Sequence, residues 1–145
     1  MQFGLLLLVV LGPRSSGDAA GWPAPWGSIA AVLGLALIAC GALLALGGAL
    51  KMGSNVTPSP RPRHGAPLLI GGAYGLVRHP MYGGLILAAF GWALFVNGPL
   101  TVLYACLLFA GLDYKTRHEE LLLQDAHEGY AEYRGRVRKL IPFLY

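Results

Sequence analysis

Charged residues are scarce in this sequence. Asp, Glu, Lys and Arg make up 12 % of its 145 residues, whereas an ordinary soluble domain has about 25 %. This scarcity argues against a soluble globular domain, and the mean hydropathy of +0.55 predicts a polytopic membrane protein. The length leaves room for one domain, because a second would be too small to build its own core. We therefore expect a single membrane domain over residues 1–145.

Cysteine is also rare, and acidic residues are fewer than basic ones. Cys40 and Cys106 both lie in apolar runs, so they form neither a disulfide framework nor a metal-ligand pattern, and we predict no metal site. The net charge is +4, but ten of the eleven Lys and Arg residues fall within residues 51–78 or 115–139, beside apolar runs. Basic residues in such places mark the cytoplasmic side of a membrane, so the charge does not indicate a nucleic-acid partner.

The N-terminal part, residues 1–50, holds two apolar segments. Gln2–Leu11 would span only about 15 Å as a helix, so we interpret it as a short or truncated membrane helix, with a cleaved signal peptide as the alternative. Pro13–Pro25 reads as a loop outside the membrane. Trp26–Leu50 has no charged residue and would form about 37 Å of helix, enough to cross a bilayer. Four of its small residues favour close packing against a neighbouring helix: Gly34, Gly41, Gly47 and Gly48.

The remaining chain divides into three further segments. Residues 51–79 form a Pro-rich basic arm on the cytoplasmic side, in which repeated prolines exclude a helix as far as Gly75. Residues 80–114 are apolar but broken at Asn97-Gly98-Pro99, which predicts a helical hairpin. Residues 115–145 hold an amphipathic cytoplasmic helix, interrupted near Gly129, and an apolar C-terminal anchor. The predicted fold is an all-α integral membrane protein with three or four transmembrane helices, including the hairpin, and a C-terminal amphipathic helix.

A polar, ring-bearing stretch separates the arm from the hairpin. Arg78 supplies a fixed charge and planar donors suited to a carboxylate, and His79 can exchange a proton near neutral pH. Pro80 sets the first turn of the next helix, whose amides suit an anionic group. Tyr74 and Tyr82 offer rings and hydroxyls. The alternative is that the arginine and the tyrosines only mark the membrane interface.

A pair of acidic residues follows the hairpin. Glu119 and Glu120 could hold ribose hydroxyls or an amino group of a ligand, or they could simply be solvated on a juxtamembrane helix. Lys115 stands four residues before Glu119, which is the spacing of an ordinary helical ion pair. Spacing alone does not choose between these interpretations.

The order of these elements is more informative than any one of them. The sequence R-H-P-M-Y at residues 78–82, a broken apolar hairpin, the Glu119-Glu120 pair, Tyr130-x-x-Tyr133 and a terminal Ile-Pro-Phe follow one another over residues 57–143. This order resembles the isoprenylcysteine carboxyl methyltransferase and phospholipid methyltransferase superfamily. Those proteins are integral-membrane enzymes that use S-adenosyl-L-methionine.

The resemblance implies a set of site residues. His79 and Glu119 would be catalytic, and Lys115 or Arg117 would contact the substrate. Backbone groups of the stretch Ala66–Leu69 would run along the adenine of the cofactor. Which glutamate is essential, and whether His118 contributes, stays open. The cofactor would be held by Leu68, Leu69, Tyr74, Arg78, His79, Pro80, Met81, Tyr82, Glu119 and Glu120.

The implied reaction is methyl transfer to a lipophilic acceptor. An isoprenylcysteine-type carboxylate would need no general base, whereas a phospholipid-like amine would need His79 or a glutamate to take a proton. The cofactor would enter from the cytoplasmic side of the plasma or inner membrane, and the acceptor would arrive from the bilayer. Two alternatives are a sterol-reductase-like enzyme that uses NADPH and a non-catalytic protein whose Gly-rich helices serve assembly. The oligomeric state is left open.

Overall fold

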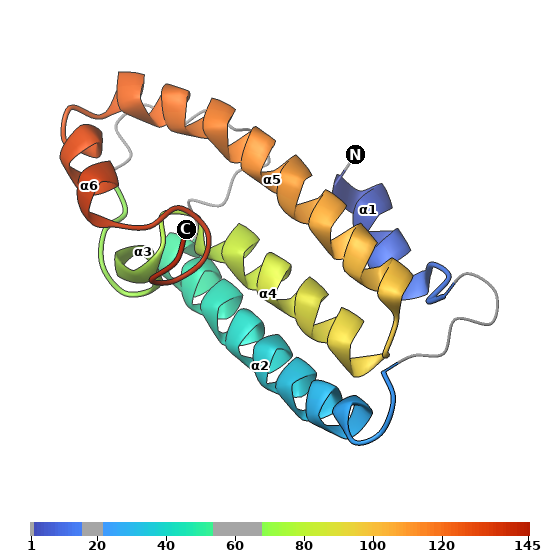
Figure 1. Ribbon diagram of the computed structural model, residues 1–145. Coiled ribbons are helices and arrows are strands. Elements are labelled where there is room, and N and C mark those ends of the chain that lie inside the picture. Colours follow the sequence, from blue (N-terminus) through green and yellow to red (C-terminus); the bar gives the residue numbers. More distant parts are fainter. Residues whose placement is uncertain (1, 16–21, 54–67) are drawn as a thin grey trace. The chain divides into compact units, whose positions relative to one another are not determined.

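Helices are the main secondary structure in the part of the chain that its structure, a computed structural model, describes. These residues are 2–15, 22–53 and 68–145. They form six helices and no strand, which confirms the predicted all-α class (Figure 1). The helices are α1 (Gln2–Leu11), α2 (Trp26–Met52), α3 (Ala73–Leu76), α4 (Pro80–Phe95), α5 (Pro99–Ala126) and α6 (Tyr130–Arg136).

The chain divides into two compact units. Unit 1 comprises Met1–Leu43 and Gly84–Leu112, and unit 2 comprises Leu44–Gly83 and Asp113–Tyr145. Helices α2, α4 and α5 contribute residues to both units. Every residue predicted for the site belongs to unit 2. That the chain is one domain stays a prediction.

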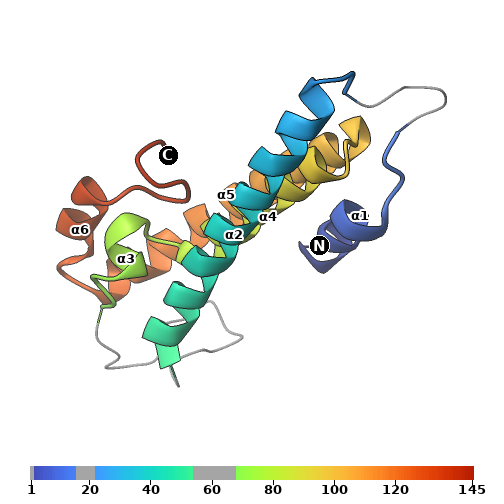
Figure 2. The same cartoon turned by 90° about the horizontal axis from the view of Figure 1, so that it is seen from below.

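In unit 1, α2 and α4 approach each other through glycines. Views from two directions show these helices side by side (Figures 1 and 2). A Cβ atom added to Gly34 would lie 2.5 Å from the carbonyl oxygen of Gly91 and 2.7 Å from the backbone nitrogen of Phe95. About two helical turns away, seven residues along each helix, Gly41 meets Gly84 in the same manner. Only glycine permits this approach, so the predicted packing role of Gly34 and Gly41 is confirmed.

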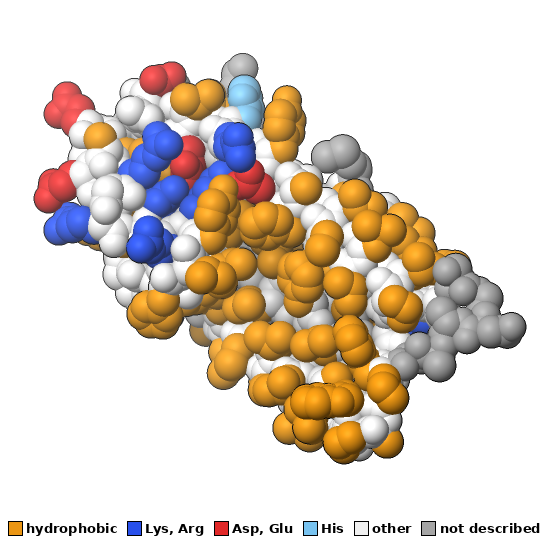
Figure 3. Space-filling model, viewed as in Figure 1, with side chains coloured by type: hydrophobic (Ala, Val, Ile, Leu, Met, Phe, Trp, Pro, Cys, Tyr) orange, Lys and Arg blue, Asp and Glu red, His pale blue; other side chains and the backbone are white. Residues whose placement is uncertain are grey.

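Unit 1 also exposes large apolar side chains. Figure 3 shows hydrophobic side chains spread over its visible face. Water would penalise so much exposed apolar surface, whereas lipid would not. Among the described helices, α2 alone is long and apolar enough to cross a membrane, and α1 and α4 are shorter apolar helices. The exposed residues of α1 and α2 include Phe3, Leu7, Leu11, Ile29, Val32, Leu33, Leu35 and Leu43.

The predicted break in the hairpin is confirmed. Helix α4 ends at Phe95 and α5 begins at Pro99. Asn97 adopts a φ of 56°, a left-handed conformation that interrupts a helix and that Asn tolerates better than most residues. Pro99 then occupies the first helical position, where its missing N–H leaves no helical hydrogen bond unmade.

Two predicted boundaries are wrong. The hairpin was expected to end at residue 114 and a separate amphipathic helix to follow, but α5 continues through this point to Ala126. The change from apolar to charged side chains does not end a helix, and residues 112–126 contain no proline or glycine. The short helix α3 also lies where the arm was expected to be irregular. The predicted interruption near Gly129 is confirmed, because this residue caps α6. Residues 54–67 of the arm lie outside the described residues.

The glycine contact of unit 1 predicts a difference between two otherwise similar substitutions. Replacing a helical glycine with alanine favours the helix by up to about 1 kcal/mol. At Gly34 the added methyl group would clash with two backbone atoms, and overpacking of this kind costs about 1–3 kcal/mol. We expect Gly34→Ala to lower the Tm measured in detergent micelles.

The matched control is Gly4→Ala in α1, where a Cβ atom meets nothing within 4 Å. This variant should keep or raise the Tm. Equal Tm values for the two variants would refute the close approach of α2 and α4.

Candidate functional site

The site is built around a corner of the chain between α3 and α4. Val77 is extended and pairs with Arg138 in an isolated parallel bridge. The backbone N–H of Arg78 donates to the carbonyl of Arg138 at 2.8 Å, and that of His79 donates to the carbonyl of Lys139 at 3.1 Å. Pro80 then starts α4. These bonds fix the Arg-His-Pro corner against the C-terminal segment of unit 2.

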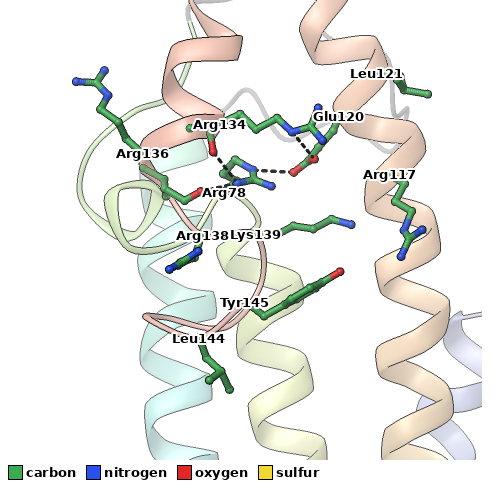
Figure 4. Close-up of a pocket in the computed structure, with 12 residues that line it drawn as sticks. Arg78, Arg117, Glu120, Leu121, Arg134, Arg136, Arg138, Lys139, Leu144 and Tyr145 are labelled. Atoms are coloured by element: carbon green, nitrogen blue, oxygen red, sulfur yellow. Dashed lines mark hydrogen bonds and ion pairs between the residues drawn. The ribbon is translucent and has the colours of Figure 1, made fainter.

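A buried ion pair joins this corner to α5. Nε of Arg78 donates to Oε1 of Glu120 at 2.7 Å, with both side chains at most 10 % exposed. Nη1 of the same guanidinium donates to the carbonyl oxygens of Arg134, at 3.1 Å, and of Val137. Nε of Arg134 approaches the other oxygen of Glu120 at 3.7 Å. Figure 4 shows Arg78 lying between Glu120 and the chain that follows α6.

His79 lies between the two glutamates. Its Nδ1 is 3.8 Å from Oε2 of Glu119, and its Nε2 is 3.3 Å from Oε1 of Glu120. The second contact lacks the geometry of a hydrogen bond, so Nε2 is buried without a hydrogen-bond partner among the described residues. Such buried orphans are rare, and they mark places where a ligand or water completes the structure.

Tyr82 and Lys115 complete the cluster on the side of Glu119. The Tyr82 hydroxyl donates to Oε1 of Glu119 at 2.9 Å, and its ring stacks on His79 at a centroid distance of 5.9 Å. Nζ of Lys115 lies 3.6 Å from the same carboxylate oxygen and 4.8 Å from the centre of the Tyr82 ring. The Tyr82 ring therefore already accepts a cation on one face. We call Arg78, His79, Tyr82, Lys115, Glu119 and Glu120 the polar cluster.

The environment fixes the protonation of several of these groups. Burial by itself would raise the pKa of Glu120, but the contacts with His79 and Arg78 outweigh it and lower the pKa from 4.5 to about 2. Glu120 is thus a carboxylate at any physiological pH. Burial raises the pKa of Tyr133 to about 12 and raises that of Tyr130 as well. Both tyrosines remain protonated, and the Tyr133 hydroxyl donates to the carbonyl of Tyr74 at 2.6 Å.

The model of one protein family, described as phospholipid methyltransferase, matches residues 29–128 of this chain. The chain belongs to this family. The match includes both halves of the polar cluster, and it confirms the resemblance predicted from the sequence. Membership in the phospholipid methyltransferase family implies a membrane-associated methyltransferase. A search of curated proteins found no significant match.

Several residues predicted for the site lie outside the polar cluster. Met81 is 38 % exposed, and Pro80 packs against α2, where a Cβ added to Gly48 would lie 2.7 Å from its Cγ. Leu68 and Leu69 are half-buried in the segment before α3, and Ala66 lies outside the described residues.

Three further residues considered for the site are also outside the polar cluster. Tyr74 is buried, and its backbone carbonyl accepts the hydrogen bond from the Tyr133 hydroxyl. Arg117 turns away from the polar cluster and binds Asp113, with Nε 2.9 Å and Nη2 2.8 Å from Oδ2. His118, whose contribution was left open, is exposed.

Sequence reasoning missed the role of the C-terminal segment. Residues 134–139, 144 and 145 line a cavity of about 680 Å³ together with Arg78, Arg117, Glu120 and Leu121 (Figure 4). Lys139 is buried there, and its Nζ binds Oδ1 of Asp113 at 2.6 Å. The basic residues of this segment had been interpreted only as topology signals. Nothing in the sequence around Lys139 indicates that its partner is Asp113, 26 residues earlier in the chain.

The pKa of Glu120 predicts how stability depends on pH. Because the folded value is about 2 and the ordinary value is 4.5, the ionised carboxylate stabilises the fold fully above about pH 4.5. This contribution, about 3 kcal/mol by linkage, is lost as the pH falls toward 2.

Thermal unfolding in micelles at pH 7, 5, 4 and 3 measures this loss. Wild-type protein should lose Tm steadily below pH 4.5, while Glu120→Gln should start lower and lose less. Glu132→Gln, at an exposed position, serves as the control and should follow the wild type. A Glu120→Gln curve parallel to the wild type would contradict the assignment.

Proposed function

We propose that this family member transfers a methyl group from S-adenosyl-L-methionine to a lipophilic acceptor, either an isoprenylcysteine-type carboxylate or a phospholipid-like amine. The observation that supports this most directly is the polar cluster. It brings His79 and Tyr82, at the start of α4, against both glutamates of α5 in a largely buried place.

The donor set of the cluster fits the chemistry of this cofactor. A carboxylate can hold ribose hydroxyls or an amino group, and the Tyr82 ring can face a cationic sulfonium as it now faces the Lys115 ammonium. Nε2 of His79 and the Tyr130 hydroxyl are both buried without hydrogen-bond partners among the described residues. When bound, S-adenosyl-L-methionine supplies a methyl group that is already activated by the positive sulfur. The protein then mainly needs to align the reactants and exclude water.

The contacts of the two glutamates give them different roles in this proposal. Glu120 is paired with Arg78 and Arg134, and its pKa of about 2 makes it a poor proton acceptor near neutral pH. We assign it to hold the cluster together. Glu119 is bound by the Tyr82 hydroxyl and Lys115, groups that can move aside without breaking a buried ion pair.

The role of the base depends on the acceptor. For an amine, His79 or Glu119 would take the proton released on methylation. For a carboxylate no base is needed, and the Lys115 ammonium would orient the acceptor. Arg117, the other predicted substrate residue, faces Asp113 instead and is better placed for a ligand of the neighbouring cavity.

We further propose that the chain is one membrane domain with three or four membrane helices. Helix α2 meets the length criterion, α1 and α4 are shorter apolar helices, and the first half of α5 is the fourth candidate. The excess of Lys and Arg in unit 2 favours the cytoplasmic side for the polar cluster. A soluble cofactor then has direct access, and a lipophilic acceptor reaches the site from the bilayer of the plasma or inner membrane.

A labelled-methyl assay tests the proposed reaction. Purified protein is incubated with labelled S-adenosyl-L-methionine and a panel of prenylcysteine analogues and ethanolamine lipids. We expect transfer to one class. Loss of an aligning or proton-accepting group should lower kcat about 100-fold in His79→Ala and Glu119→Gln. Glu119→Gln should keep the wild-type Tm, whereas Glu120→Gln should lower activity and Tm together.

His127→Ala and Glu132→Gln are the controls, since both lie outside the polar cluster and should keep full activity. Binding of S-adenosylhomocysteine and of NADPH is compared by calorimetry on the same samples. Binding of NADPH alone would overturn the proposal in favour of a reductase. Unchanged S-adenosylhomocysteine binding in His79→Ala and in a double Glu119→Ala, Glu120→Ala variant would also contradict it.

Cysteine labelling tests the proposed sidedness. In a background without Cys40 and Cys106, single cysteines replace Ser15 and Lys51, which are both exposed. Because Lys51 closes α2 on its basic side, a membrane-impermeant maleimide should label position 51 only after the cells are opened. Position 15 should react in intact cells. Labelling of both positions from the same side would contradict a single crossing by α2.

A further inference from the structure

Half of the twelve residues that line the cavity beside the polar cluster are Arg or Lys. Its walls come from three parts of unit 2: the corner before α4, the charged half of α5, and the chain from α6 to the C-terminal segment. Arg78, Arg117, Arg134 and Lys139 reach it from these different walls (Figure 4). Figure 3 shows Lys and Arg side chains gathered in one region of the surface, with Asp and Glu side chains among and beside them.

The carboxylates nearby do not balance these charges. Glu120 is contacted by Arg78 and Arg134, and Asp113 is contacted by Arg117 and Lys139. Arg136, which is paired with Glu132, and Arg138 line the cavity as well. Six cationic side chains therefore meet three carboxylates, which leaves an excess of positive charge at the cavity. Such a surplus in a partly enclosed place favours an anionic ligand.

Two of the cations are fixed and two can adjust. The Arg78 guanidinium is held by Glu120 and by two backbone carbonyls. Nζ of Lys139 is held by the carbonyl oxygen and a carboxylate oxygen of Asp113, at 3.2 and 2.6 Å. The side chains of Arg117 and Arg134 are 68 % and 51 % exposed, so they are less constrained than the other two and can turn toward a ligand.

We propose that this cavity binds a phosphate monoester group. A phosphate monoester carries nearly two negative charges near neutral pH and has three acceptor oxygens. Its negative charge suits the excess of positive charge at the cavity, and the oxygens suit donors that arrive from several walls. Guanidinium groups bind phosphate through two parallel hydrogen bonds, which makes the two adjustable arginines the natural clamp.

The phosphate can come from a soluble compound or from a lipid head group. The cavity, at about 680 Å³, is larger than a phosphate and leaves room for an organic part. Two exposed leucines at its wall, Leu121 and Leu144, offer apolar contact to such a part. This inference does not rest on methyl transfer, because binding here needs no cofactor.

Calorimetry on the full chain in detergent micelles, without cofactor, tests the proposal. The probes are inorganic phosphate and short-chain phosphatidic acid, with short-chain phosphatidylcholine as the lipid that lacks a monoester. We expect binding of phosphate and phosphatidic acid, and a fall in affinity of about tenfold in Arg117→Gln and in Arg134→Gln. Lys51→Gln removes the same charge at the exposed end of α2, outside the cavity, and should bind as the wild type does.

The arms of this experiment separate the two sources. Phosphatidic acid that binds more than tenfold tighter than phosphate, with the difference abolished in Leu121→Ser, supports a lipid head group. Equal affinities support a soluble phosphate. The proposal is overturned if neither phosphate nor phosphatidic acid binds, if phosphatidylcholine binds equally well, or if Lys51→Gln weakens binding as much as the two arginine variants. Each variant's Tm is measured first, so that a loss of binding is not confused with unfolding.

Discussion

The ion pair between Arg78 and Glu120 is the contact on which the arrangement of unit 2 depends. Its partners lie 42 residues apart, on α5 and on the corner before α4. A buried charge without its partner is strongly unfavourable, by about 3–5 kcal/mol. The same guanidinium also binds the carbonyls of Arg134 and Val137, so one side chain holds three segments together. Any change that removes it loosens the walls of both the polar cluster and the cavity.

This use of Glu120 clarifies why the sequence carries two glutamates in a row. Adjacent residues of a helix point about 100° apart, yet both carboxylates reach His79, because the imidazole presents one nitrogen to each. Glu120 is bound in a buried ion pair with Arg78, whereas Glu119 contacts Tyr82 and Lys115, and those contacts are easier to exchange for a ligand. A site that must be rigid and still admit a ligand needs both properties. Two acidic residues supply them more simply than one.

The sequence predicted what local chemistry determines and missed what distant contacts determine. The boundaries of α2 and the break at Asn97-Gly98-Pro99 follow from runs of apolar residues and from helix-breaking residues, and both were found. The continuation of α5 beyond residue 114 was missed because polarity was taken as a boundary. The meeting of His79 with the glutamates was expected only from a family resemblance. The C-terminal segment that lines the cavity is held by the Asp113–Lys139 ion pair and by backbone hydrogen bonds to Arg138. No periodic pattern in the sequence predicts these contacts.

The two glycines after Tyr82 show how tightly one short stretch can be constrained. In unit 2, a Cβ on Gly83 would clash with the carbonyl oxygen of Leu140, so this position lets α4 touch the C-terminal segment. In unit 1, the carbonyl oxygen of Gly84 lies where a side chain on Gly41 would have to be. Tyr82 itself must present its hydroxyl to Glu119 and its ring to His79. These three consecutive residues therefore meet different neighbours, and each position demands a different property. Position 82 needs an aromatic ring with a hydroxyl, position 83 needs the absence of a side chain, and position 84 needs a backbone that another helix can approach. Because a substitution at any of the three would break a different contact, the stretch Tyr82–Gly84 constrains the fold and the site together.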